Sequence, residues 1–390
     1  MKPSIRNSSI GILTVALLGV CGWWGYGYWI ERTTAAYGQQ CRELRNQKQW
    51  KALAQLGQQW SEWDPSSADA WLFQAEAAQE SSSLETAVDL LARIPIDDKK
   101  AIPALIMKAN IEFEDLNQPL DAVKTCHQLL QIKPSLPFAN QRLIFFYALT
   151  SQRQKLIEQI TAAIRLGCEP REAYAYLMIS DALSFTNGFE VNSAWRQSSP
   201  DAEVFIVGRA VQMAQFIQAL PNVDTSVYGT AETRDRLMQD YLKKYPHNPA
   251  LIRYFLHRAA GQGDVRQVGK LLSQVPDAHA DDSIFWRYRG WYHNAHDELD
   301  EAEAAYRKSS TLFPLDWQTK HELASVLRRK QKLDEVERLQ QLALEGKQIS
   351  SDILQIPNAA AISGPMLARI QRYAANCGDD LVRQSLARRL

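Results

Sequence analysis

The chain has 390 residues, of which 46% are hydrophobic and 23% charged, and these values exclude disordered, collagenous and low-complexity proteins. It carries 44 Lys and Arg against 44 Asp and Glu, so its formal net charge is zero. Proteins that bind nucleic acid usually show a basic footprint, and we therefore expect no nucleic-acid partner.

The first predicted element follows a short tail at residues 1–9 and covers residues 10–30. This segment carries no charge, and a helix of its length spans about 30 Å, the thickness of a hydrocarbon core. Trp23, Trp24 and Trp29 crowd its far end, as aromatic rings do at a membrane boundary. We expect an uncleaved transmembrane helix. A cleaved signal peptide is the alternative, but its apolar run is usually only about 7–15 residues long.

The charges around this span indicate its orientation. Lys2 and Arg6 precede it, and a short N-terminus ahead of a single anchor usually stays in the cytoplasm. We therefore expect residues 31–390 to be periplasmic or otherwise extracytoplasmic. The five cysteines are widely spaced and odd in number, which predicts free thiols, most of them buried, and neither a disulfide framework nor a zinc site.

Prolines recur at a spacing that indicates an internal repeat. The interval from Pro65 to Pro134 is close to two periods of about 34 residues, and so is the interval from Pro246 to Pro314. A period of this length marks a solenoid of helix–turn–helix units.

Residues 283–316 form the clearest unit. Its positions 4, 8, 20, 24 and 32 are Trp286, Gly290, Ala302, Tyr306 and Pro314. This unit resembles the tetratricopeptide repeat (TPR), whose pattern has an aromatic, a small residue, Ala, an aromatic and Pro at those positions. Small residues at 8 and 20 allow two helices to approach closely, large ones at 4 and 24 fill the gaps between helices, and the proline ends the second helix.

Weaker units keep the same phase, with Trp71, Ala87, Ala122 and Pro134 at the corresponding positions. They cover residues 68–101, 103–136, 137–170, 249–282 and 317–350. The resemblance implies an all-α fold, in which the transmembrane helix is followed by a TPR-type superhelical solenoid with an irregular hinge.

The phase breaks once, because the interval from Pro134 to Pro246 exceeds three periods by roughly a third of a repeat. Turn signals at Thr186-Asn187-Gly188 and Ser198-Ser199-Pro200 lie in this interval. The predicted domains are therefore a first arm at 31–185, a hinge loop at 186–199, a second arm at 200–350 and capping helices at 351–390.

Catalytic motifs are absent from the sequence. It contains no phosphate loop, no dinucleotide-binding glycine motif, no nucleophile elbow and no HExxH or CxxC. His293 and His296, with Asp297 beside them, are the strongest candidate metal ligands, but they fall in the turn of the clearest repeat, where a solvated turn explains them equally well. We predict no enzyme activity, no metal and no cofactor.

The concave face is the better candidate for function. In TPR proteins the first helix of each pair lines this face, mainly through positions 2, 5, 9, 12 and 13. Carried onto this sequence, the resemblance implies an apolar strip in the first arm and a strip of arginines and aromatic residues in the second, residue types that interface hot spots favour. The candidate partner-binding residues are Met107, Ile111, Phe138, Phe145, Arg253, Arg287, Trp291, Asn294, His321 and Arg328.

Two interpretations of these side chains stay open. Arg287 and Arg328 are expected to be exposed and to contact a partner. Alternatively, the arginines pair with acids of the same solenoid and Trp291 only packs.

The predicted function is that of a membrane-anchored scaffold or adaptor that captures an unknown protein or peptide in its groove. A self-associating structural scaffold is the alternative, and Cys21 and Gly25, at small-xxx-small spacing in the anchor, would permit close helix approach. A metal-dependent enzyme that uses His293 and His296 is the third and weakest alternative.

Overall fold

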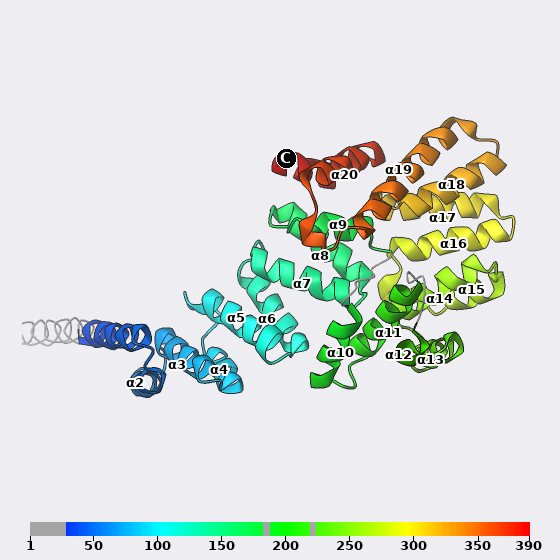
Figure 1. Cartoon of the computed structure of the whole chain (residues 1–390). Coiled ribbons are helices and arrows are strands. Elements are labelled where there is room, and N and C mark those ends of the chain that lie inside the picture. Colours follow the sequence, from blue (N-terminus) through cyan, green and yellow to red (C-terminus); the bar gives the residue numbers. More distant parts are fainter. Residues whose placement is uncertain (1–28, 182–187, 219–223) are drawn as a thin grey trace, which may run out of the picture. The chain divides into compact units, whose positions relative to one another are not determined.

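The computed structural model describes residues 29–181, 188–218 and 224–390. Within these ranges every regular element is a helix and no strand occurs. The contacts divide the chain into two compact units, which we call the N-terminal unit, ending at Leu116, and the C-terminal unit, from Asn117 to Leu390. Figure 1 labels the helices of both units.

The N-terminal unit is built from consecutive paired helices. Its described part begins at residue 29 with a helix that ends at residue 46. The elements that follow are α2 (Trp50–Trp63), α3 (Ala68–Glu80), α4 (Leu84–Leu91), α5 (Ala101–Asn110) and the π-helical turn η1 (Ile111–Asp115). Trp60 is almost fully buried and stacks on Tyr37, with ring centroids 5.7 Å apart.

The C-terminal unit continues the series of paired helices, and its early helices contact its last ones. Its first helices are α6 (Pro119–Ile132), α7 (Pro137–Leu149), α8 (Arg153–Leu166), α9 (Glu172–Met178), α10 (Gly188–Ser198) and α11 (Glu203–Gln218). The middle helices are α12 (Thr225–Tyr228), α13 (Ala231–Lys244), α14 (Pro249–Gly261), α15 (Val265–Leu272), α16 (Ser283–Ala295) and α17 (Leu299–Leu312). The last are α18 (Trp317–Arg329), α19 (Val336–Leu354), α20 (Gly364–Cys377) and α21 (Asp380–Arg389), with short 3-10 turns η2 (Asp277–His279), η3 (Leu333–Glu335) and η4 (Ala359–Ala361).

The turns inside the helix pairs confirm the repeat expected from the sequence. In seven of the turns between consecutive helices, residues with a positive φ recur within two runs with a period of about 34 residues. They are Lys48, Ser82, Asn117 and Ser151 in the first run and Gly263, Asp297 and Gln331 in the second. The interval from Ser151 to Gly263 equals that from Pro134 to Pro246, so the turns show the same phase break as the prolines. The left-handed residue reverses the chain between two helices. The backbone conformation therefore repeats with the same period as the side-chain pattern.

Side chains at the TPR signature positions explain why the paired helices approach closely. A Cβ on Gly290 would lie 2.7 Å from the ring of Tyr306, which is fully buried, as is Ala302. The indole of Trp286 donates to the carbonyl of Ala280 at 2.7 Å.

The same position-4 contact recurs in other repeats, where the side chain bonds the carbonyl six residues upstream. The pairs are Trp71 with Pro65 at 3.0 Å, Asn140 with Pro134 at 3.0 Å, and Lys320 with Pro314. Pro134 and Pro314 follow the ends of α6 and α17, as the repeat pattern predicts, and Ala87 and Ala122 are fully buried between helices.

The early helices of the C-terminal unit meet its last helices. Helix α8 contacts α21, and α9 contacts α19 and η4. Buried Glu169 accepts hydrogen bonds from Tyr174, Ser385 and Arg389 at 2.6–2.7 Å, and Ser350 donates to the carbonyl of Met178 at 2.8 Å. Figure 1 shows α8 and α9 beside α19 and α20. The segment 351–390 therefore contacts helices far away in the sequence as well as the last repeat.

Two parts of the predicted domain plan differ from the structure. Helix α10 occupies 188–198, where a hinge loop was expected, because Asn192 is fully buried and bonds the carbonyl of Leu149 at 2.9 Å. The compact units divide at Leu116, and the proposed arms at 31–185 and 200–350 do not separate at 186–199. Ion pairs that cross the expected hinge, described below, join those arms.

The predicted membrane anchor lies almost entirely outside the described residues, which include only Trp29 and Ile30 of the segment 10–30. Trp29 lies 5.8 Å from Trp63, ring centroid to ring centroid. Among the helices of 29–181, 188–218 and 224–390, none combines the length and apolar character that a bilayer crossing requires. None of the four described cysteines forms a disulfide, and Cys41, Cys126 and Cys168 are buried.

Candidate functional site

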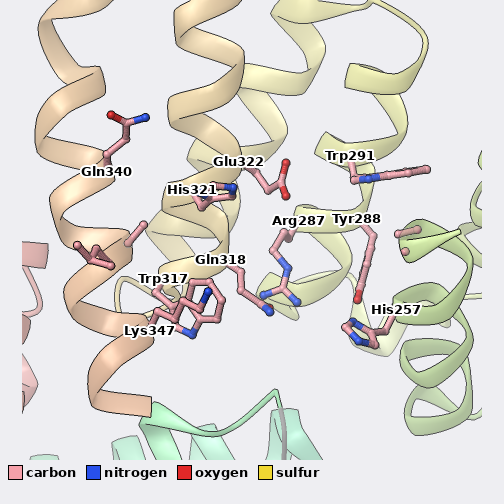
Figure 2. A pocket seen from close by; sticks show the side chains of 14 residues that line it. His257, Arg287, Tyr288, Trp291, Trp317, Gln318, His321, Glu322, Gln340 and Lys347 are labelled. Atoms are coloured by element: carbon pink, nitrogen blue, oxygen red, sulfur yellow. The ribbon is translucent and has the colours of Figure 1, made fainter. Parts of the chain in front are cut away.

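The first candidate site is a pocket of about 620 Å³ in the C-terminal unit, formed by α14, α16, α18 and α19. Its walls combine aromatic rings with polar and charged side chains. The lining includes His257, Arg287, Tyr288, Trp291, Trp317, Gln318, His321, Glu322, Gln340, Leu344 and Lys347. In the view of Figure 2, Arg287 lies between Trp291 and Trp317. We call this cavity the α16–α18 pocket.

Three residues predicted for the groove meet in this pocket, namely Arg287, Trp291 and His321. They share it because α16 and α18 are the first helices of consecutive repeats, so equivalent positions of the two repeats lie side by side. The repeat positions of these three residues in the sequence predicted that they would lie on one face.

Sequence reasoning missed Trp317, Leu344 and Lys347. Trp317 is the first residue of α18, and the other two lie on α19, the second helix of its pair, which the TPR pattern does not assign to the concave face. The side chain of Leu344 is 69% exposed, and the ammonium of Lys347 lies 5.9 Å from the ring centroid of Trp317. The exposure of Leu344 beside the rings of the pocket can be read only from the structure.

Arg287 forms the floor of the pocket, and its expected exposure was wrong. It is only 5% exposed, and its Nη1 donates to Asp181 at 2.5 Å and to Asp316 at 2.8 Å. Burial disfavours the charged guanidinium, but these two carboxylates outweigh it and raise the pKa of Arg287. The guanidinium is therefore a structural element, as the alternative interpretation of the sequence held.

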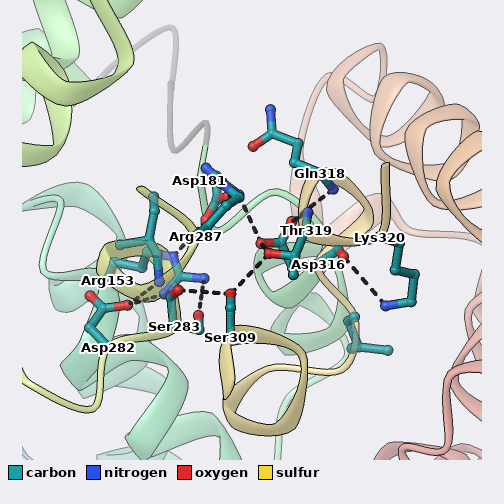
Figure 3. A network of polar contacts seen from close by, with 12 residues as sticks. Arg153, Asp181, Asp282, Ser283, Arg287, Ser309, Asp316, Gln318, Thr319 and Lys320 are labelled. Atoms are coloured by element: carbon teal, nitrogen blue, oxygen red, sulfur yellow. Dashed lines mark hydrogen bonds and ion pairs between the residues drawn. The ribbon is translucent and has the colours of Figure 1, made fainter. Parts of the chain in front are cut away.

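A second buried arginine shares the same acid (Figure 3). Arg153 donates through Nε to Asp181 at 2.6 Å and through Nη2 to Ser283 at 3.1 Å, and it also pairs with Asp282. Arg153 begins α8, whereas Asp282 and Ser283 begin α16. This network joins parts of the chain that the sequence had placed in separate arms.

Two acids of the network, Asp282 and Asp316, are helix caps that recur with the repeat. Asn248, Asp282 and Asp316 precede α14, α16 and α18 at intervals of one repeat, and each accepts hydrogen bonds from backbone N–H groups of its helix. Because position 5 of one repeat lies near the cap of the next, Arg287 reaches Asp316, 29 residues further along. The local capping pattern thus places Asp282 and Asp316, whereas Asp181 lies beyond the end of α9.

Burial raises the pKa of Glu322, which lines the same pocket. Trp291 is half-buried and packs against the core cluster of α14 and α16. The pocket therefore combines aromatic and apolar side chains with a comparable number of polar and charged ones.

The remaining predicted groove residues do not join this pocket. Ile111 is fully buried in the core of the N-terminal unit, and Met107 is half-buried against that core. Phe145 is 37% exposed on α7 of the C-terminal unit, and Phe138 on the same helix is half-buried with Arg142 above its ring at 5.6 Å.

Three more of them stand apart in the C-terminal unit. Arg328 is exposed on α18. Asn294 accepts a hydrogen bond from Arg329. Arg253 is buried and lines a different cavity.

The candidate metal ligands have other partners. His293 Nδ1 lies 2.6 Å from a carboxylate oxygen of Glu298, and His296 Nδ1 lies 3.1 Å from the carbonyl of Tyr292. In the described part of the chain no group of three or more His, Cys, Asp and Glu side chains is placed to hold a metal ion.

Comparisons with known proteins find resemblance only among solved structures. No protein-family profile matches the chain, and no curated protein sequence matches it. The Cut9–Hcn1 hetero-tetramer of APC/C matches at 15% identity over 89% of this chain and 76% of that chain, with a TM-score of 0.31. Yeast Tom70 matches at 12% identity over 92% and 88%, with a TM-score of 0.30.

A tetratricopeptide repeat protein from Parabacteroides merdae matches at 11% identity over 75% of this chain and 98% of that chain, with a TM-score of 0.28. At such low identities and TM-scores, none of these matches carries an argument. The TPR-like character of the fold rests on the helix pairs, the turns and the caps described above.

Proposed function

We propose that the protein is a scaffold or adaptor whose C-terminal unit captures a segment of a partner protein in the α16–α18 pocket. The observation that carries the proposal is the pocket itself, about 620 Å³ in volume, with the exposed side chain of Leu344 at its wall beside Trp291 and Trp317. Exposed apolar side chains around a cavity favour burial by a partner.

The chemistry of the lining indicates what the segment carries. Apolar side chains of the partner would pack on Trp291, Trp317 and Leu344. Lys347 is exposed at the same wall and favours an acidic group nearby, whereas Arg287 is already neutralised by Asp181 and Asp316. An amphipathic helix or peptide with an acidic flank meets both requirements.

Crosslinking in membranes of the native host, followed by purification of the full-length chain and mass spectrometry, tests this proposal. We expect a recurrent partner with the unmodified chain and its loss with Leu344→Asp, which places a charge at the wall. Leu333→Asp is the matched control, because Leu333 is 62% exposed outside the pocket. Equal recovery with both variants would exclude the α16–α18 pocket as the binding site.

We further propose that residues 10–30 anchor the chain in a membrane and that residues 31–390 lie on the extracytoplasmic side. The support is the uncharged run from Ile10 to Ile30, its aromatic end and the basic residues before it. Retention of the chain in membranes after alkaline carbonate washing, with cleavage of the C-terminal unit by externally added protease in spheroplasts, is the expected result. Release by carbonate would contradict the anchor.

The second candidate function is a self-associating scaffold, which the spacing of Cys21 and Gly25 in the proposed anchor favours. Sedimentation of the full-length chain in detergent across a range of concentrations separates the two functions. A mass that rises with concentration, together with crosslinks only between copies, would favour self-association over the adaptor.

A further inference from the structure

A second cavity of the C-terminal unit, of about 270 Å³, lies where the beginnings of α8, α11 and α14 converge. It is separate from the α16–α18 pocket and shares no lining residue with it. Arg153, Lys155, Val204, Asn248, Arg253 and His279 are among its walls. We call it the α8–α14 pocket.

Arg253 is the unusual group in this pocket. It is only 5% exposed, and its one hydrogen bond to the described residues runs from Nη2 to the carbonyl of Ser151 at 3.4 Å. Among the described residues, no carboxylate forms an ion pair with it. A guanidinium has five N–H donors, so most of the hydrogen-bonding capacity of Arg253 is unused within this part of the chain.

The two other buried arginines of the same region show what is missing. Arg153 pairs with Asp181 and Asp282, and Arg287 pairs with Asp181 and Asp316. Three carboxylates, those of Asp181, Asp282 and Asp316, therefore form ion pairs with these two arginines. Buried charges in proteins are normally paired, and Arg253 departs from that rule.

The electrostatics of Arg253 reflect its burial. Burial lowers the pKa of its guanidinium and repulsion from Arg153 lowers it further, whereas attraction to Asp282 and Asp181 opposes this shift without reversing it. The pKa values of Arg153 and Arg287 are raised by their acids. The positive charges of Arg253 and Arg153 would favour a negative charge in the pocket.

Other groups of the lining agree with an anionic occupant. Lys155 is exposed at the pocket and forms no ion pair with any described residue. His279 Nδ1 is buried without a hydrogen-bond partner among these residues. The beginning of α8 carries no side-chain cap, so its N–H groups are available to an anion.

The two acids of the lining are already engaged. Asp282 pairs with Arg153 and accepts from the N–H of Ile284, and Glu203 accepts from the side chain of Asn248 at 2.7 Å. Neither forms an ion pair with Arg253, although the charge of Asp282 acts on its guanidinium from nearby.

We infer that the α8–α14 pocket binds a small anion, a carboxylate or phosphate group, with the Arg253 guanidinium as its principal ligand. Lys155 lies at the pocket as a second cation, and His279 Nδ1 and the N–H groups at the start of α8 are further donors. Such a site would stabilise the junction between α8 and α14, because the occupant contacts both.

Calorimetric titration of the full-length chain in detergent with inorganic phosphate, and separately with acetate, tests the inference. Both titrations are matched in ionic strength with sodium chloride. Saturable binding of one molar equivalent of either ion is expected, and the tighter of the two identifies the site as one for phosphate or for carboxylate. No saturable binding of either ion would overturn the inference and leave Arg253 solvated by water alone.

Single substitutions then test which residues form the anion site. Arg253→Gln is expected to weaken binding at least about tenfold, because a charge-assisted bond is lost. Lys155→Gln, at an exposed position, is expected to weaken it about two- to fivefold. Arg258→Gln on the same helix, where Arg258 pairs with Asp235 at 2.5 Å outside the pocket, is the matched control and should bind as the unmodified chain does. Equal affinity of Arg253→Gln and the control would overturn the assignment.

Val204→Glu provides a second route if Arg253→Gln fails to fold. Val204 lines the pocket from α11, and a carboxylate there would compete with the anion for Arg253. Phosphate and acetate binding should be lost while the helical circular dichroism is retained. Undiminished binding in folded Val204→Glu would contradict the inference.

Discussion

Arg287 and Asp181 are 106 residues apart in the sequence, and their side chains form an ion pair of 2.5 Å beneath the α16–α18 pocket. Asp181 also binds Arg153, so one carboxylate joins α8 and α16. The pair makes the floor of the pocket part of the structural core, so a partner in the proposed function would contact the walls above it.

Replacing Asp181 with Asn should destabilise the C-terminal unit by about 3–5 kcal/mol, because two buried guanidinium groups lose a shared charge. The free energy of unfolding in urea measures the effect. Asp240→Asn is the control, since Asp240 pairs with Lys243 at the surface at 3.1 Å and should cost less than about 0.5 kcal/mol. Similar losses for the two variants would contradict a structural role for the network.

Gly290→Ala should destabilise the chain by about 1–3 kcal/mol, because the new Cβ would lie 2.7 Å from the buried ring of Tyr306. Gly261→Ala is the control on α14, where no atom lies within 4 Å of an added Cβ. That variant should be neutral or gain up to about 1 kcal/mol from helix propensity. Thermal unfolding of both variants checks the expected difference, and a neutral Gly290→Ala would show that the two helices are not tightly packed there.

Glu169 should make the stability of the C-terminal unit depend on pH. Burial opposes its ionisation, but hydrogen bonds from Tyr174, Ser385 and Arg389 outweigh that effect and hold its pKa below the ordinary 4.5. Because the folded pKa is depressed, the unfolded chain takes up protons first as the pH falls. The contribution of Glu169 is therefore complete above about pH 4.5 and is lost as the pH falls toward the folded pKa.

Urea midpoints of the unmodified chain and Glu169→Gln at pH 7 and pH 4 test this. The difference between the two proteins should shrink at pH 4. Glu301→Gln, at an exposed position of α17, should show no such change. An undiminished difference at pH 4 would refute the linkage.

Chelation should not affect the fold. His293 is paired with Glu298 and His296 with the carbonyl of Tyr292, so neither ring is poised with a third ligand. We expect the melting temperature to be unchanged by EDTA and by added zinc, and His296→Ala to melt like the unmodified chain. A rise in melting temperature with zinc that His296→Ala abolishes would revive the metal hypothesis.

The repeat could be predicted from the sequence because its determinants are local. Turn residues, helix caps and the small and large residues of a pair all act within about one repeat, so the spacing of Pro246 and Pro314 and the pattern of 283–316 are sufficient. Helices α20 (Gly364–Cys377) and α21 (Asp380–Arg389) lie in the segment 351–390, where capping helices were predicted.

Tertiary structure alone decided which groove residues are available. In the sequence, Arg253, Arg287 and Arg328 are all candidates for the groove. In the structure, Arg253 is buried without an ion pair to a described acid, Arg287 is buried in ion pairs with two acids, and Arg328 is exposed. The physical reason is that one partner comes from a distant part of the chain. Asp181 reaches Arg287 because α8 and α9 return to the later helices: α8 contacts α21, α9 contacts α19, and Arg153 of α8 pairs with Asp282 at the start of α16. Periodicity places a side chain on a face, whereas its burial and its ion pairs depend on which distant segment covers that face.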